Sequence, residues 1–203
     1  CIAANATKLT HPSHSYQPTH AGRLVHADLV GPFRLSYRQK YKYMLVLVDD
    51  HTRFKFVYFL KDKTEQLKMV KRFVAQFNSH LSSKATGPVR VVGHLRTDNA
   101  GEYLSREFTE FLDDAGIAHT TCPPHVHQLN GVAERAIRTI MEQVRAHLRV
   151  SNLSRDMWTF AAQHAVDIIN RTSGPPGTEE SSFEMLTGSK PRIMPIMPFG
   201  CRA

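Results

Sequence analysis

Two short stretches decide the fold and carry the candidate chemistry: LRTDNAGEY at residues 95–103 and NGVAER at residues 130–135. The first is typical of the end of a strand, with Asp98 at its tip and a glycine-containing turn after it. The second is typical of a glycine-led loop that enters a long amphipathic helix, with Glu134 in the first turn. Thirty-five residues lie between Asp98 and Glu134. The two stretches therefore predict a strand tip and a helix start that each present a carboxylate.

A third acid, Asp28, closes the strand-like run LVHAD at residues 24–28. Three carboxylates held on strand tips and a facing helix suit chemistry on phosphate. Two Mg²⁺ or Mn²⁺ ions, about 4 Å apart, would activate an oxygen nucleophile and stabilise the leaving oxygen. Spacing alone leaves a second interpretation open, in which Asp98 only initiates a turn and Glu134 only favours a helix N-terminus.

Composition favours a folded protein with polyanionic partners. Of the 203 residues, 41% are hydrophobic, which is enough for a real core. The net charge of +8 and the pI of about 9.6 favour nucleic acid, although such charge can also serve solubility alone. No apolar run has the length of a membrane span or the form of a signal peptide. Three scattered cysteines form no even disulfide framework, which indicates a reducing compartment.

The order of strand-like and helix-like segments predicts the architecture. Strand patterns occupy residues 24–30, 41–48, 54–60, 89–95 and 117–121, and helical patterns begin near residues 64 and 107 and cover about 130–149, 155–170 and 183–186. Three consecutive antiparallel strands followed by strand–helix alternation predict an α/β fold. We expect a mixed five-stranded sheet, with parallel strands after the antiparallel ones and helices on its faces.

The helix at 130–149 carries a basic stripe beside its apolar stripe, and Glu134 lies on the seam between the two. A metal-binding acid needs that position, because packing anchors it while it faces bound phosphate. An ordinary surface helix with i,i+4 ion pairs explains Arg138 and Glu142 but not the gathering of arginines. We therefore expect DNA contacts from Arg135, Arg138, Arg145 and Arg149.

The loop before that helix is a second candidate for DNA contact. Residues 123–128, PPHVHQ, are poor formers of regular structure and predict a mobile surface loop. We expect His125, His127, Gln128 and Asn130 to contact DNA, while a merely flexible loop remains an open alternative.

Three other polar residues near the acids are expected to have structural roles. Asp49 and Asp50 lie in a tight hairpin and are expected to form the turn rather than bind metal. His26, two residues before Asp28, shares its face of the strand, and we expect it to be packed rather than to contact substrate.

Four motifs together resemble the integrase core of retroelements, specifically the copia-like retrotransposon branch. They are HADLVGP at 26–32, VDDHTR at 48–53, RTDNAGEY at 96–103 and NGVAER at 130–135, with further matches at 169–172, 188–191 and 199–203. The resemblance implies a ribonuclease-H-like fold with Asp28, Asp98 and Glu134 as catalytic metal ligands for two Mg²⁺ or Mn²⁺ ions. It also implies trimming of the 3′ ends of element DNA, followed by attack of the 3′-hydroxyl on target DNA.

The resemblance also implies an organisation and a setting. Residues 1–22 would be an extended lead-in, 23–172 the catalytic core and 173–203 a Pro/Gly-rich extension. Cys1 is similar to the last cysteine of the family's zinc module, and a start without Met suggests a piece of a longer polyprotein. Double-stranded DNA, a dimer or tetramer of the chain, action in the nucleus and earlier residence in cytoplasmic virus-like particles would follow. Two alternatives are a DNA transposase or nuclease of the same fold, and a domesticated, non-catalytic DNA-binding or assembly protein.

Overall fold

The computed structural model describes residues 18–82, 92–122, 130–193 and 197–201, and in them one five-stranded sheet has the order β3-β2-β1-β4-β5. β1 pairs antiparallel with β2, as β2 does with β3, whereas β4 runs parallel to β1 and β5 parallel to β4. The strands are β1 (Val25–Val30), β2 (Tyr43–Asp49), β3 (Lys55–Leu60), β4 (His94–Thr97) and β5 (Ala118–Thr121). The predicted mixed sheet is confirmed.

The helices follow the predicted order, with small shifts at their ends. They are α1 (Gln66–Ser82), α2 (Arg106–Asp114), α3 (Gly131–Val150), α4 (Trp158–Thr172) and α5 (Ser182–Thr187), with 3₁₀ turns η1 (Lys63–Glu65), η2 (Gly101–Leu104) and η4 (Arg155–Met157). β4 begins at His94, later than the strand predicted at 89–95: Val92 and Gly93 are described and precede it, and residues 89–91 lie outside the described part. None of the described helices combines the length and apolarity that a membrane crossing requires.

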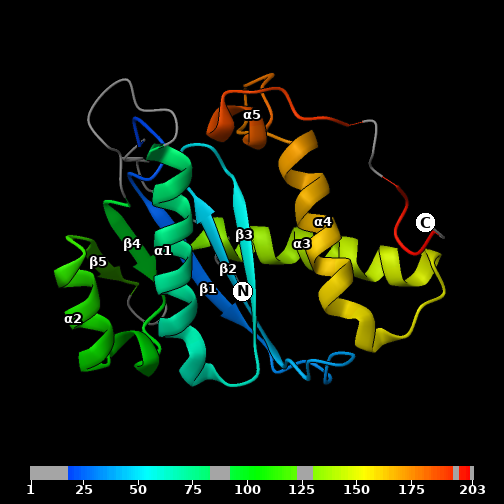
Figure 1. The fold of residues 1–203 in the computed structure, drawn as a ribbon, viewed down its shortest axis with the longest axis horizontal. Coiled ribbons are helices and arrows are strands. Elements are labelled where there is room, and N and C mark those ends of the chain that lie inside the picture. The colour runs from blue at the N-terminus through cyan, green and yellow to red at the C-terminus, as the bar shows by residue number, and fades with distance from the viewer. Residues whose placement is uncertain (1–17, 83–91, 123–129, 194–196, 202–203) are drawn as a thin grey trace, which may run out of the picture.

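Helices cover both faces of the sheet and create two cores (Figure 1). β2 shows why its sequence is almost entirely apolar: Met44 to Val48 are all at most 1% exposed. Leu45 and Leu47 join the core beneath α1 and α2, while Met44, Val46 and Val48 pack with α3 and α4. A strand buried on both faces needs no polar alternation, which is the pattern that the sequence predicted.

α3 lies on β1 and β2 through one apolar stripe. Ala136, Ile140 and Val144 recur every four residues and are at most 5% exposed, in one core with the β2 side chains. This spacing places them on one side of the helix and leaves its arginine stripe on the other. Packing of α3 thereby fixes where its first turn, with Glu134, meets the sheet. The expected division of the chain at residues 22 and 172 stays a prediction.

The outer edge of β3 is capped by side chains from two helices. Asn170 of α4 accepts a hydrogen bond from the Lys55 backbone N–H at 2.9 Å and donates to the Lys55 carbonyl at 2.8 Å. At the other end, Glu65 accepts from the Lys61 backbone N–H at 2.7 Å. The amide of Asn170 thus replaces one residue of a neighbouring strand.

We expect Asn170→Ala to lower the free energy of unfolding by about 2 kcal/mol, because two hydrogen bonds are lost and the Lys55 backbone is left unpaired. Urea unfolding followed by the fluorescence of Trp158, the single tryptophan and a buried one, measures this change. Gln163→Ala, an exposed position on the same helix, is the control. Equal effects of the two substitutions would contradict the capping role.

Candidate functional site

Asp28 lies in the middle of the sheet, on the face that α3 covers. It stands opposite Val46 of β2, and Val46 packs against α3, whereas Ala27 points into the core on the α1 side. The Asp28 side chain is half-buried. β1 therefore holds its carboxylate rigidly at the point where sheet and helix α3 meet.

Asp98 directly follows β4, which runs parallel to β1 with Arg96 beside His26. Continuing that register brings Asp98 level with Asp28. Asp98 Oδ1 accepts a hydrogen bond from the Ala100 N–H at 3.3 Å, so the carboxylate also initiates the turn that follows. Asp98 thus does initiate a turn, and this hydrogen bond fixes its side chain beside the neighbouring strand.

Glu134 is exposed on the first turn of α3. The start of that helix is tied to β1 by Asn130, whose side-chain N–H donates to the Ala27 carbonyl at 3.3 Å. Asn130 is only 4% exposed, and its side-chain N–H is used inside the protein; its expected contact with DNA stays a prediction. Asn130 thereby holds the helix bearing Glu134 against the residue that precedes Asp28.

The negative charges of Asp98 and Glu134 both act on the Asp28 carboxylate. Burial, the main cause, and the negative charges of Asp98 and Glu134 raise the pKa of Asp28 to about 7, against a lowering by the Leu29 backbone N–H. Carboxylates from three segments that are distant in sequence therefore interact electrostatically. Such mutual repulsion is typical of sites that bind cations.

The carboxylates of Asp28, Asp98 and Glu134 are suitable ligands for magnesium, but they do not lie close enough together to bind it as they stand. Three carboxylates offer the hard oxygen ligands that Mg²⁺ prefers. In the described ranges, however, no three His, Cys, Asp or Glu side chains lie close enough together to hold an ion. Metal binding would thus require the carboxylates of Asp28, Asp98 and Glu134 to come closer together than they lie in this structure.

Two neighbours of the acids were not singled out from the sequence. Tyr103 is fully buried, and burial together with the charges of Asp98 and Asp28 raises the pKa of its hydroxyl well above the usual value. Burial also raises the pKa of the Cys122 thiol; Arg96 opposes that shift, and Asp98 and Glu134 add to it. Tyr103 stands within the decisive stretch itself, so its place near the acids was open to inference; Cys122 carried no such signal.

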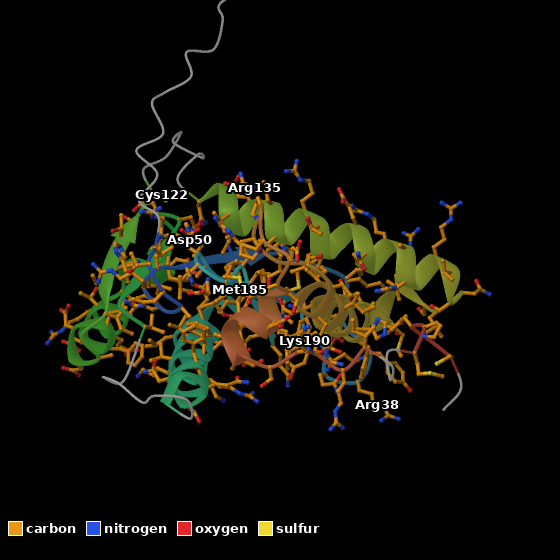
Figure 2. The ribbon with its side chains drawn as sticks, turned by 90° about the horizontal axis from the view of Figure 1, so that it is seen from above. Arg38, Asp50, Cys122, Arg135, Met185 and Lys190 are labelled. Atoms are coloured by element: carbon orange, nitrogen blue, oxygen red, sulfur yellow. The ribbon has the colours of Figure 1, made fainter. Side chains whose placement is uncertain are left out.

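The arginines of α3 lie where the helical pattern predicted them. Arg135, Arg138, Arg145 and Arg149 are all exposed. In Figure 2, where Arg135 is labelled, side chains on the outer side of this helix project away from the body of the protein. The stripe begins one residue after Glu134, so it extends directly from the acids. His125, His127 and Gln128 lie outside the described residues.

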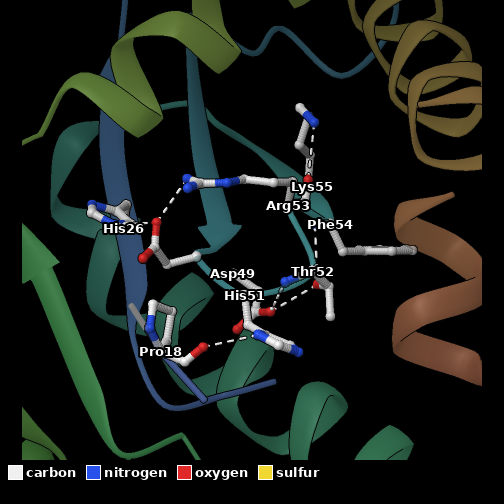
Figure 3. A network of polar contacts seen from close by, with 9 residues as sticks. Pro18, His26, Asp49, His51, Thr52, Arg53, Phe54 and Lys55 are labelled. Carbon is white, nitrogen blue, oxygen red and sulfur yellow. Dashed lines mark hydrogen bonds and ion pairs between the residues drawn. The ribbon is translucent and has the colours of Figure 1, made fainter. Parts of the chain in front are cut away.

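Asp49 and Asp50 have the structural roles expected of them. Asp49 is fully buried and accepts hydrogen bonds from the N–H groups of Gly22 and Thr52, at 2.7 and 2.8 Å, and from the Thr52 hydroxyl at 2.7 Å. Asp50 pairs with Arg53 at 2.7 Å and lies 3.2 Å from His26 Nε2 (Figure 3). His26 is 2% exposed, so it is packed, as expected.

Comparison with known proteins gives a consistent result. The family model described as "Integrase core domain" matches residues 18–127. The chain is 34% identical over its whole length to the "Retrovirus-related Pol polyprotein from transposon TNT 1-94" of Nicotiana tabacum, and 29% identical over 99% of its length to that from transposon RE1 of Arabidopsis thaliana. It is also 25% identical to the Ty1-LR3 Gag-Pol polyprotein of Saccharomyces cerevisiae, over 98% of its length. The chain spans 15%, 13% and 11% of these three polyproteins.

Solved structures share the fold. The chain is similar to a chain of a simian T-cell lymphotropic virus intasome in complex with a PP2A regulatory subunit, with a TM-score of 0.67, 20% identity, and coverage of 89% of this chain and 59% of that one. It is also similar to the HTLV-2 integrase catalytic core domain in complex with magnesium, with a TM-score of 0.60, 22% identity, and coverage of 83% and 99%. The predicted ribonuclease-H-like fold is thereby confirmed.

Proposed function

The chain belongs to the integrase core domain family, in its copia-like retrotransposon branch, and from this premise we propose that it is a metal-dependent polynucleotidyl transferase. Its proposed reaction is the hydrolytic trimming of the 3′ ends of element DNA, followed by attack of each 3′-hydroxyl on a phosphodiester of target DNA. The proposed catalytic residues are Asp28, Asp98 and Glu134.

One observation carries the proposal: β1 and β4 run parallel beside each other and Asn130 ties the start of α3 to β1, so that the segments bearing Asp28, Asp98 and Glu134 meet. The pKa of Asp28, raised to about 7 by burial and by Asp98 and Glu134, agrees with this. A surface carboxylate that only formed a turn would not be expected to interact electrostatically with two acids from other segments, as Asp28 does with Asp98 and Glu134. Half-burial also limits water around Asp28, and this strengthens its interaction with any bound cation.

The residues of this chain would position the reacting groups. β1 and β4 fix Asp28 and Asp98 side by side, and Asn130 holds the start of α3 against β1 so that Glu134 faces them. Mg²⁺ or Mn²⁺, in our proposal two ions, would supply activation of the attacking oxygen and stabilisation of the leaving oxygen. The HTLV-2 core domain, a structural neighbour, is a magnesium complex, which supports this choice of ion.

The test is a strand-transfer assay of the purified chain with a labelled blunt DNA end and a plasmid target. We expect joined products with Mg²⁺ or Mn²⁺ and none with EDTA. Trimming of ends without joining would favour a nuclease of this fold. DNA binding with neither reaction, in the presence of both metals, would overturn the proposal in favour of a non-catalytic DNA-binding protein.

The arginine stripe of α3 gives a prediction for DNA binding. Replacing Arg138 and Arg145 together by Gln should reduce the slope of log K against log salt by about two, because each arginine that neutralises a phosphate displaces about one counterion. Fluorescence anisotropy with a labelled duplex across a salt series measures the slope. Arg72→Gln with Lys68→Gln, on α1 at the opposite face of the sheet, is the charge-matched control. A slope unchanged by the α3 pair would refute the contact.

The proposal also covers the DNA substrate, the oligomeric form and the cellular location. Double-stranded DNA, as element ends and as target, is the proposed substrate, and a dimer or tetramer is the proposed working form. The structural neighbours include an intasome and a magnesium-bound trimeric core domain, which support assembly. Action in the nucleus, after residence in cytoplasmic virus-like particles, is part of the same proposal.

A further inference from the structure

A cluster of basic side chains lies on the sheet next to the proposed catalytic acids. Arg96 of β4 and His26 of β1 stand side by side in the sheet, and each comes two residues before an acid, Asp98 and Asp28 respectively. Side chains two residues apart in a strand point to the same face. Arg96 therefore lies on the face that carries the acids, one step along the strands from them.

Asp50, a carboxylate whose pKa Arg96 helps to lower, already has other partners. Asp50 Oδ1 contacts Arg53 at 2.7 Å and His26 Nε2 at 3.2 Å, and Figure 3 shows His26 and Arg53 reaching this position from β1 and from the start of β3. Burial would raise the pKa of Asp50, but His26, Arg53 and, with the smallest effect, Arg96 lower it. Arg96 thus acts on Asp50 only at long range.

The Arg96 side chain makes neither an ion pair nor a hydrogen bond in the described part of the chain. Its Nε is buried and makes no hydrogen bond there, and no ion pair joins its guanidinium to a described carboxylate. A half-buried guanidinium that is not paired costs free energy, since it has lost part of its hydration. An anion that binds beside the acids would recover that cost.

Other polar groups around Arg96 are also suited to an anion. His94, two residues earlier, contacts the Thr120 hydroxyl of β5 at 2.6 Å. The pKa of His94 is lowered by burial and further by Arg96, His119, Arg23 and His26, which shows that cationic groups gather at this position. Of the described acids near Arg96, Asp50 is neutralised by Arg53, while Asp98 and Asp28 lie on the same face two residues further along the strands.

We propose that Arg96 binds a phosphodiester of the DNA strand next to the one held at the acids, with His94 and Thr120 bordering this subsite. The inference rests on the proposed function and deepens it: the strand would run from the acids across β4, in addition to its contacts with α3. The planar guanidinium donates two parallel hydrogen bonds to phosphate oxygens, which a lysine does not reproduce.

The test measures binding in EDTA, so that it does not depend on catalysis. The probe is a fluorescein-labelled blunt DNA duplex, and a series of duplexes carries one neutral methylphosphonate at successive positions near the 3′ end. We expect Arg96→Gln to weaken binding about tenfold and Arg96→Lys less, with Arg72→Gln within twofold of the parent. We also expect one methylphosphonate to weaken the parent but to have no further effect on Arg96→Gln.

The outcomes separate three situations. Binding by Arg96→Gln within twofold of the parent, or a loss that does not depend on which phosphate is neutral, would overturn the subsite. A lower melting temperature of Arg96→Gln with unchanged binding would assign Arg96 to Asp50 as a structural counter-ion. Should Arg96→Gln fail to fold, Arg96→Lys decides, through the same phosphate-by-phosphate comparison. The strand-transfer assay tests the proposed function separately, because its failure leaves the binding result standing.

Discussion

Replacing Glu134 by Gln, or Asp98 by Asn, is expected to lower the rate of strand transfer by roughly a thousandfold or more. Each change removes one negative ligand from the proposed metal site, and a loss of this size corresponds to about 4 kcal/mol of transition-state stabilisation. Because neither residue lies in a hydrophobic core, the fold and the α3 arginines should be retained. The measurement is the initial rate of joining in Mg²⁺ and in Mn²⁺, with DNA binding measured in parallel.

Glu142→Gln is the matched control for Glu134→Gln. Glu142 is exposed on the same helix, two turns further along, and its replacement removes the same charge. We expect its rate to stay within a few-fold of the parent. Should Glu134→Gln keep a rate within tenfold of the parent, or should both variants lose activity equally, the assignment of Glu134 to the metal site would be wrong.

Asp28→Asn is expected to abolish joining and, without metal, to stabilise the protein at neutral pH. The pKa of Asp28 is about 7 in the folded chain against an ordinary value of 3.8, because burial and then Asp98 oppose its charge. The folded state therefore holds a proton that the unfolded state has released, so stability falls as pH rises from about 4 to 7. The full pKa difference corresponds to roughly 4 kcal/mol, and we expect about 3 because water reaches part of this carboxyl.

Urea unfolding in EDTA at several pH values checks this prediction. The stability advantage of Asp28→Asn should be small near pH 4, grow up to pH 7 and stay constant above it. Asp113→Asn, exposed at the end of α2, controls for the loss of one negative charge. Added Mg²⁺ should stabilise the parent but not Asp28→Asn, because only the parent retains the full set of acids. A pH-independent advantage would show that Asp28 does not titrate in this range.

The sequence was informative wherever one local pattern determined the structure. Five consecutive apolar residues in β2 had to be buried on both faces, and a four-residue apolar repeat in α3 determined which side of that helix faces the sheet. The same repeat placed Glu134 and the arginines on the other side. The pairing of Asp28 with Asp98 came from the family resemblance, and the parallel register of β1 and β4 is consistent with it.

Local patterns failed where a side chain serves a distant segment. Asn130 precedes a helix in a polar stretch, and nothing in that stretch indicates that its amide binds a carbonyl 103 residues away. Arg96 looked like an ordinary strand residue until β1 and β4 were seen to place it beside His26. Hydrophobic periodicity predicts which face of a helix or strand is buried. It does not predict which side chain of another segment lies opposite, because that depends on how the strands pair in the folded protein.

The capping of β3 by Asn170 and Glu65 has a consequence for the behaviour of the protein at high concentration. An edge strand exposes unpaired N–H and C=O groups that can template another chain and begin aggregation. Lys55 and Lys61 are occupied at the two ends, so alternation leaves only Val57 and Phe59 with outward backbone groups. Two residues are too few to recruit a stable extra strand. The β3 edge of the sheet is therefore closed by the side chains of Asn170 and Glu65, which accept hydrogen bonds that a further strand would otherwise accept.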